Sequence, residues 1–217
     1  MIQMKQVFTT ALNKQYECPK GVMGRIAGEV MVHQHRPETV WTLQLLDIQP
    51  TDDVLEAGFG AGQGIKLAAA RVTSGHIRGI DLSEEMVRVA TKRNASAIKA
   101  GRVTLSQGSI TALPFEDQSF DKIMTIHTMY FWPEPHEPSQ ALSELCRVLK
   151  PGGPLIITLS TGKINAQGEV QVWEPLQSAL EEQIMPALQR KGFPVVRLEQ
   201  GPVSRHYTSV AVIGKKG

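Results

Sequence analysis

Residues 53–64 of the chain read DVLEAGFGAGQG, and this stretch decides the fold. Its first part, 53–57, is a short apolar run that is typical of a buried strand. The next part, 58–62, carries glycine at every other position, and 65–72 then has helical character. Glycines at a strand-to-helix junction let the backbone turn tightly and let a ligand approach without a Cβ in the way. The stretch therefore predicts a βα unit with a ligand-binding loop, although the bare loop is also compatible with an ordinary tight turn.

The alternation of strands and helices continues on the carboxyl side of this loop. Further strands are expected at 77–80, 103–106, 120–126 and 155–159. Ser83 is placed to cap a helix whose first turn is acidic, and a helix over 139–149 ends at the Pro-Gly-Gly of 151–153. Strands that alternate with helices predict parallel βαβ units with right-handed crossovers.

The amino-terminal part of the chain departs from this alternation. Helices are expected over 22–30 and 38–48, with Pro37 as a first helical residue. We therefore expect one domain over 1–217, in which 1–50 forms a helical cap and 51–217 forms a Rossmann-like α/β core.

The last sixty residues also change character. A helix over 175–190 is expected to kink at Pro186 and to end at Gly192. Two strands, 195–199 and 207–213, follow, and the Gln-Gly-Pro between them reads as the turn of an antiparallel pair.

Composition excludes several classes of protein. The chain has 217 residues, 41% of them apolar, and its 23 basic and 21 acidic residues leave a formal net charge of +2. This balance excludes an acidic disordered chain and a strongly basic nucleic-acid coat. No apolar run approaches the ~18 residues of a membrane span, and 1–12 has no apolar core of a secretory signal. Cys18 and Cys146 cannot form a disulfide framework, so a reducing, cytoplasmic compartment is expected.

Two acidic residues beside the glycine loop indicate the kind of ligand. Asp81 follows Gly58 by 23 residues and ends the second expected strand, where a carboxylate can accept both hydroxyls of a ribose. Glu56 precedes the first glycine, where it would repel a pyrophosphate but attract a cationic amino-acid moiety. Gln63 also stands where a dinucleotide-binding loop has its third glycine. The charges favour S-adenosylmethionine (SAM) over NAD.

Four motifs in register resemble the class I SAM-dependent methyltransferases. The resemblance is greatest to the small-molecule group that includes the ubiquinone and menaquinone biosynthesis methyltransferases (methyltransferase type 11). The motifs are VLEAGFGAG at 54–62, GIDLS at 79–83, GSITALPFEDQSFD at 108–121 and ELCRVLKPGG at 144–153. The resemblance implies a seven-stranded, mostly parallel sheet with helices on both faces and an antiparallel last strand.

The resemblance also implies a cofactor site, with SAH as the product. The methionine part of SAM would lie against Glu56, Gly58, Gly60 and Gly62, and the ribose against Asp81. The adenine would lie near Leu82, Met86, Ser109 and Ile110. Ser109 departs from the family, which usually has an acid or an amide at this place, so its side chain reaches less far toward the adenine.

His127 is the candidate for a catalytic role. It ends the fourth expected strand, at the edge that faces the ligand in a doubly wound sheet, and it would contact SAM or accept a proton. It is equally compatible with an ordinary loop histidine. The aromatic residues Tyr130, Phe131 and Trp132 would form the floor of an acceptor pocket or part of the core, with core favoured for Phe131 and Trp132.

Other chemistry is not indicated by the sequence. No metal site is expected, because His33 and His35 stand apart from other metal ligands at zinc spacing. The Asn/Asp-Pro-Pro-aromatic tetrapeptide of many enzymes that methylate nucleic-acid bases is absent after the fourth expected strand, so a nucleic-acid partner is disfavoured. In the amino-terminal part, Arg25 would pair with the SAM carboxylate and His33 or Tyr16 would face the acceptor, unless this stretch is simply a solvated helix.

The sequence therefore predicts an enzyme that transfers a methyl group from SAM to a small molecule. The alternative is a SAM-binding protein with a regulatory or scaffold role and no transferase activity. The acceptor pocket is expected to be built from the amino-terminal segment, the aromatic loop at 128–138 and a lid at 161–173.

Overall fold

The computed structural model describes residues 32–132 and 140–217, so the expected helix at 22–30 and most of the expected loop at 128–138 lie outside the described residues. Within the described ranges an eight-stranded sheet runs in the order β3-β2-β1-β4-β5-β8-β7, with β6 paired to β5. The strands are β1 (Asp53–Ala57), β2 (His76–Asp81), β3 (Val103–Gln107), β4 (Lys122–Ile126), β5 (Pro154–Ile164), β6 (Val170–Val172), β7 (Val195–Ser204) and β8 (Tyr207–Lys215).

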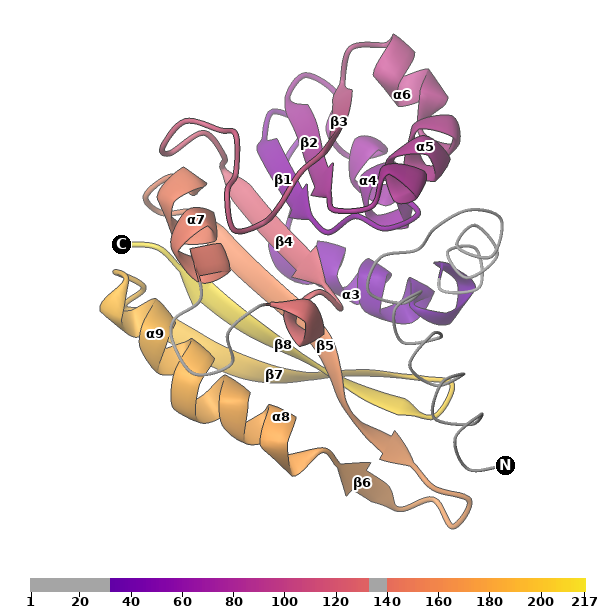
Figure 1. Cartoon of the computed structure of the whole chain (residues 1–217), viewed down its shortest axis with the longest axis vertical. Coiled ribbons are helices and arrows are strands. Elements are labelled where there is room, and N and C mark those ends of the chain that lie inside the picture. Colours follow the sequence, from indigo (N-terminus) through magenta and orange to yellow (C-terminus); the bar gives the residue numbers. More distant parts are fainter. Residues whose placement is uncertain (1–31, 133–139) are drawn as a thin grey trace, which may run out of the picture.

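Helices cover both faces of this sheet (Figure 1). One group, on the right in the figure, comprises α3 (Arg36–Leu46), α4 (Gln63–Ala69), α5 (Glu84–Arg93) and α6 (Ala95–Lys99). The other group, on the left, comprises α7 (Gln140–Val148), α8 (Glu174–Ser178) and α9 (Met185–Arg190). Each group buries a separate apolar cluster against the sheet. No helix in the described ranges is long and apolar enough to cross a membrane.

The strand directions follow the expected class. β1 lies between β2 and β4 and pairs with both in parallel, whereas β8 is antiparallel to both β5 and β7. The mostly parallel, Rossmann-like sheet with an antiparallel last strand is therefore confirmed. Because β1 is followed by β2 on one side and β4 lies on the other, the order of the strands reverses beside β1. Ligands bind at such a switch point in open α/β sheets.

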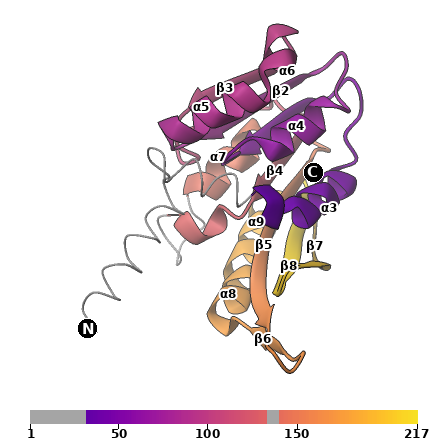
Figure 2. The ribbon, with the colours of Figure 1, turned by 90° about the vertical axis from the view of Figure 1, so that its right-hand side faces the viewer.

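The stretch 161–173 is a hairpin extension of the sheet. β5 continues to Ile164 and pairs with β6, and both project beyond the other strands with α8 beside them (Figure 2). Asn165 closes the turn, since its Oδ1 accepts the backbone N–H groups of Gln167 and Glu169 at 3.0 and 2.9 Å. The sequence analysis missed β6, because a three-residue exposed strand carries little periodic signal.

The expected turn at 200–202 is wrong. These residues lie inside β7, where the pairing with β8 shifts register between Gln200 and Val203. Position 201 requires a glycine because α3 packs closely against it. An added Cβ there would lie 2.4 Å from a ring carbon of Trp41. The chain reverses instead at Arg205 and His206, with Arg205 at a positive φ of 56°. Glycine followed by proline indicated a local turn, but a tertiary contact explains the glycine.

The expected kink at Pro186 takes the form of a wide turn. A π-helical segment, Ala179–Ile184, separates α8 from α9, and Pro186 follows in the first turn of α9. Proline has no N–H to donate to the preceding turn, and a π segment accommodates that loss. Gly192 has a φ of 90° at the end of the helix, as expected.

Gly62 is required for the packing of α4 against α5. It caps α4 with a φ of 78°, and its carbonyl oxygen accepts a 3.0 Å hydrogen bond from Asn94 Nδ2. An added Cβ would lie 2.6 Å from the Cβ of Ala90. Gly60 also has a positive φ, 51°, but nothing lies within 4 Å of the same added atom.

We therefore expect Gly62→Ala to lower the free energy of unfolding more than Gly60→Ala. The left-handed backbone costs both variants about 1–2 kcal/mol, and the clash with α5 adds roughly 1–3 kcal/mol at Gly62 alone. Urea denaturation of the two variants measures the difference. Equal destabilisation would contradict the packing role of Gly62.

Candidate active site

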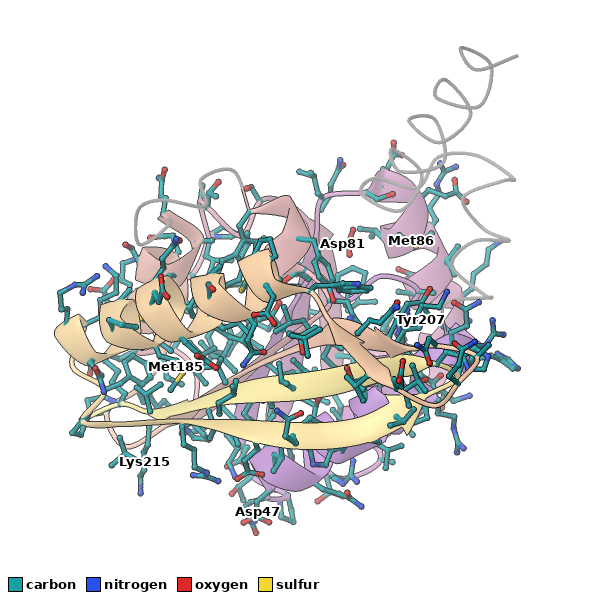
Figure 3. All side chains as sticks on the ribbon, turned by 90° about the horizontal axis from the view of Figure 1, so that it is seen from below. Asp47, Asp81, Met86, Met185, Tyr207 and Lys215 are labelled. Atoms are coloured by element: carbon teal, nitrogen blue, oxygen red, sulfur yellow. The ribbon has the colours of Figure 1, made fainter. Side chains whose placement is uncertain are left out.

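A cavity of about 410 Å³ opens at the carboxyl ends of the parallel strands. The loops that follow β1, β2, β3 and β4 each contribute to its wall, and α3 contributes from the amino-terminal side. Figure 3 shows Asp81 and Met86, which both line the cavity, near each other in the upper half of the view, away from Asp47 and Lys215 in its lower part. The topology thus brings together residues that are more than 90 positions apart in the sequence.

Nearly all the sequence-predicted site residues line this cavity. They are Glu56, Gly58, Gly60, Asp81, Leu82, Met86, Ser109, Ile110 and His127. Gly62 is not among the lining residues, in keeping with its packing role. His33 is exposed and lines a separate shallow groove beside Trp41. Tyr16 and Arg25 lie outside the described residues.

Glu56 is a buried carboxylate with unused capacity for a ligand. It is 3% exposed, and its Oε2 has no hydrogen-bond partner in the described structure. The backbone N–H of Ile65, in the first turn of α4, donates to the carboxylate. Burial, with the neighbouring Asp81 carboxylate, raises the pKa of Glu56 to about 8. A cation beside Oε2 would reverse this shift, because it would stabilise the charged form.

Asp81 joins the glycine loop to the start of α5. Its Oδ2 accepts the backbone N–H of Gly60 at 2.8 Å, and its Oδ1 accepts that of Ser83 at 2.9 Å. Burial raises the pKa of Asp81, while these two hydrogen bonds act in the opposite direction. Each oxygen retains a lone pair, so the carboxylate can still accept hydrogen bonds from a diol in the cavity.

The side chains expected near an adenine differ in character. Met86 is fully buried in α5, where its backbone N–H is capped by Ser83 Oγ at 3.3 Å, whereas Leu82 is 56% exposed. Ser109 Oγ lies 2.7 Å from Thr111 Oγ1 and accepts the Thr111 N–H at 3.1 Å. Its hydroxyl therefore stabilises the loop after β3, and Ile110 offers an apolar surface beside it.

His127 follows β4, on the other side of β1 from Asp81, and has a strained backbone conformation. Its φ is 56°, a region that residues other than glycine rarely adopt. Its ring lies 4.1 Å from that of His35, centroid to centroid, and its Nε2 lies 4.0 Å from Glu38 Oε1. Burial, with the neighbouring His35, lowers the pKa of His127 to about 3, although Glu38 acts in the opposite direction. The imidazole is therefore neutral in the ligand-free protein.

The amino-terminal end of α3 places two side chains beside His127 that were not predicted from the sequence, and of these His35 lines the cavity. His35 caps α3, and Glu38, in its first turn, is fully buried with Oε1 3.7 Å from His35 Nδ1. Burial is the largest effect and raises the pKa of Glu38, but the contacts with His35, with its own backbone N–H and with His127 together outweigh it and hold the pKa below its usual value. The local pattern around Pro37 indicated a helix start, but nothing in it indicated that β4 would bring His127 to this helix.

The aromatic residues after β4 have different roles. Tyr130 Oη donates to the Ser160 carbonyl at 2.8 Å and accepts the Ser160 N–H at 2.7 Å. Trp132 is 9% exposed and belongs to the core, but it also lines the cavity, and its indole N–H has no partner among the described residues. Trp132 is thus both core and cavity wall.

Comparison with known proteins identifies relatives of this chain. A family model described as a methyltransferase domain matches residues 55–157. An uncharacterised methyltransferase, YdaC, of Bacillus subtilis is 32% identical over 144 residues, which cover 66% of this chain and 76% of that protein. A demethylmenaquinone methyltransferase of Shouchella clausii is 30% identical over 158 residues, 72% of this chain and 63% of that protein. The chain therefore spans somewhat less than two thirds of the latter's length.

Solved structures show the same fold. A SAM-dependent methyltransferase from Aquifex aeolicus superposes with a TM-score of 0.63 at 24% identity, over 86% of this chain and 92% of that one. The matching region of the sequence, 55–157, contains the glycine loop, Asp81, the loop after β3 and His127. Helix α3, which also contributes to the cavity, lies outside this region.

Proposed function

The chain belongs to the class I SAM-dependent methyltransferases, and on that premise we propose that it transfers a methyl group from SAM to a small-molecule acceptor in the cavity described above. The observation that carries this proposal is one cavity lined on both sides of β1: Asp81 ends β2 on one side, and His127 follows β4 on the other. We assign Glu56, whose carboxylate interacts with that of Asp81, to a first end with Asp81, and His127, its neighbour His35 and Trp132 to a second end. The first end suits a charged nucleoside cofactor, and the second is left for an acceptor.

The residues of the first end fit SAM. The unpartnered, buried Oε2 of Glu56 would accept a hydrogen bond from the α-ammonium group. Asp81 would hold the ribose hydroxyls, and Met86 and Ile110 would pack against the adenine. The volume of about 410 Å³ lies within the range of small-molecule sites. When bound, SAM supplies a methyl group that its sulfonium makes electrophilic.

In such a reaction the protein positions the cofactor and the acceptor relative to each other and excludes water. The glycine loop and Asp81 would fix the cofactor, and the buried residues of the second end would orient the acceptor against it. We place His127 at this end as the catalytic residue, because its neutral imidazole is buried at the end of β4 with Nε2 unpartnered. Its strained backbone is in keeping with a functional position.

Asp81→Ala should weaken SAM binding by roughly 10- to 100-fold, since it removes charge-assisted hydrogen bonds worth about 1.5–3 kcal/mol. Calorimetric titration with SAM and SAH measures the change. Asp81→Asn is the matched control, because it keeps the shape of the side chain and loses only the charge, so it should fall between the wild type and the alanine variant. Unchanged affinity in Asp81→Ala would remove Asp81 from the ribose site.

SAM binding should release a proton from Glu56 near neutral pH. The free carboxyl, with its pKa of about 8, is mostly protonated at pH 7, and the ammonium of SAM would favour the ionised form. Affinity should therefore rise from about pH 6 to 7.5, a range in which an α-ammonium group stays mostly charged. Calorimetry in two buffers of different ionisation enthalpy counts the protons. In Glu56→Gln the release should disappear; a release that persists would assign it to another group.

His127→Asn should lower turnover at least 10-fold and leave SAM affinity nearly unchanged, because His127 lies at the acceptor end. Asparagine tolerates the left-handed backbone of this position, so the fold should be preserved. A screen of small-molecule acceptors that measures SAH formation supplies the assay. Equal losses of turnover and SAM affinity would make His127 a cofactor contact instead. A chain that binds SAM with no acceptor turned over would support the regulatory alternative.

A further inference from the structure

We propose that His35, Glu38 and His127 form a binding site for a divalent transition-metal ion, with Zn²⁺ as the reference ion. The three side chains each offer one ligand atom, and these atoms all lie within 4.8 Å of one another. The metal site goes beyond methyl transfer itself, and binding of the ion can be measured without SAM or an acceptor.

The carboxylate of Glu38 is fully buried, the side chains of His35 and His127 are 30% and 15% exposed, and the nitrogen atom that each histidine offers is itself buried. Within the described structure, His35 Nδ1, Glu38 Oε2 and His127 Nε2 have no hydrogen-bond partner. Ser209 Oγ donates a long hydrogen bond, 3.3 Å, to Glu38 Oε1. A buried carboxylate needs charged or hydrogen-bonding partners to offset its desolvation. A bound cation would satisfy all three groups at once.

The tautomer of His127 points to the same conclusion. The single hydroxyl proton of Tyr130 is donated to the Ser160 carbonyl, so the Tyr130 oxygen can only accept at its 3.5 Å contact with His127 Nδ1. The ring proton of His127 therefore belongs on Nδ1, which leaves a lone pair on Nε2. That lone pair faces Glu38 Oε1 at 4.0 Å, a distance too long for a hydrogen bond. Two acceptors that face each other across this gap leave room for a cation.

The spacing suits Zn²⁺ after a small contraction. Zinc binds imidazole nitrogen and carboxylate oxygen at about 2.0–2.2 Å, which places two ligand atoms of a tetrahedron about 3.4 Å apart. The observed separations from Glu38 Oε1 are 3.7 Å to His35 Nδ1 and 4.0 Å to His127 Nε2. All three ligand atoms lie within 4.8 Å of one another, so side-chain movements of about 1 Å would bring them to the tetrahedral spacing. Tyr130 beside Nδ1 would serve as the outer partner that fixes a ligating histidine.

The backbone holds these residues in place from three elements. Thr42 Oγ1 and Thr158 Oγ1, both buried, lie 2.7 Å apart and join α3 to β5. The His127 N–H donates to the Thr158 carbonyl at 2.8 Å, so α3 and the end of β4 are attached to the same residue of β5. His35 and Glu38 therefore keep their position relative to His127 without a ligand.

The ion would have an open coordination position at the cavity. His35 and His127 both line the cavity, and three protein ligands leave the fourth tetrahedral position free, as in catalytic zinc sites. An oxygen or nitrogen atom of the acceptor would complete the coordination there and would lose its proton more readily. This role for the ion, unlike its binding, rests on the proposed methyl transfer.

Titration of metal-stripped protein with Co²⁺, followed by visible absorption, tests the site, and competition with Zn²⁺ gives its affinity. The wild type should bind one Co²⁺ per chain with the strong d–d bands of four-coordinate cobalt. Glu38→Gln, His35→Asn and His127→Asn should each weaken binding by more than the roughly 10- to 100-fold loss that follows removal of an outer partner. His33→Asn, an exposed histidine two residues from His35, should bind as the wild type does.

Two results would overturn the proposal: no Co²⁺ binding by the wild type, or unchanged binding in the folded ligand variants. Thermal unfolding identifies any variant that has lost its fold, and the remaining variants then decide. Titration of the same proteins with SAH separates the two proposals. Retained SAH binding without metal binding removes the metal site alone, whereas metal binding without SAH binding removes the proposed cofactor.

Discussion

The carboxylate of Asp81 is the interaction on which the geometry of the cavity depends. It binds the backbone of the glycine loop through Gly60 and the start of α5 through Ser83. The Gly58 N–H donates in turn to the carbonyl of Ile80, one residue before Asp81. Two loops that follow neighbouring strands are thereby fixed to each other. The position expected to hold the ribose is thus also the position that shapes the site.

Buried ionisable groups surround this cavity at a cost to stability. Glu56 is held largely protonated at neutral pH, against its preference in water, and the lowered pKa of His127 keeps that imidazole neutral even in mildly acidic solution. Ionisable groups with shifted pKa values are concentrated at functional sites, where a bound ligand can compensate their charge. On the two proposals above, a cationic group of the cofactor would compensate Glu56, and a metal ion would compensate the cluster of His35, Glu38 and His127.

Local patterns predicted the strands, the glycine loop and the cap at Ser83, because each depends on residues close together in the sequence. Asp81 could be placed as well, since parallel strands bring their carboxyl ends to one edge. The contact of His35 with His127 could not, because it depends on how α3 crosses β4 and β5. The same reason explains Gly201, whose neighbour in space is Trp41. The expectation of no metal site rested on spacing along the chain, whereas the three side chains that we propose as ligands come together from positions up to 92 residues apart.

The place of β8 within the sheet has a consequence for biosynthesis. β8 lies between β5 and β7, and Val210, Ala211 and Val212 at its centre are fully buried. During translation, the half of the sheet from β3 to β5 emerges first and contains most of the cavity wall. β5 then presents an unpaired edge until residues 207–215 leave the ribosome, and such an edge invites pairing with other chains. A chain whose synthesis ends before residue 207 would therefore have a nearly complete cavity wall, but the unpaired edge of its β5 would make it prone to aggregate.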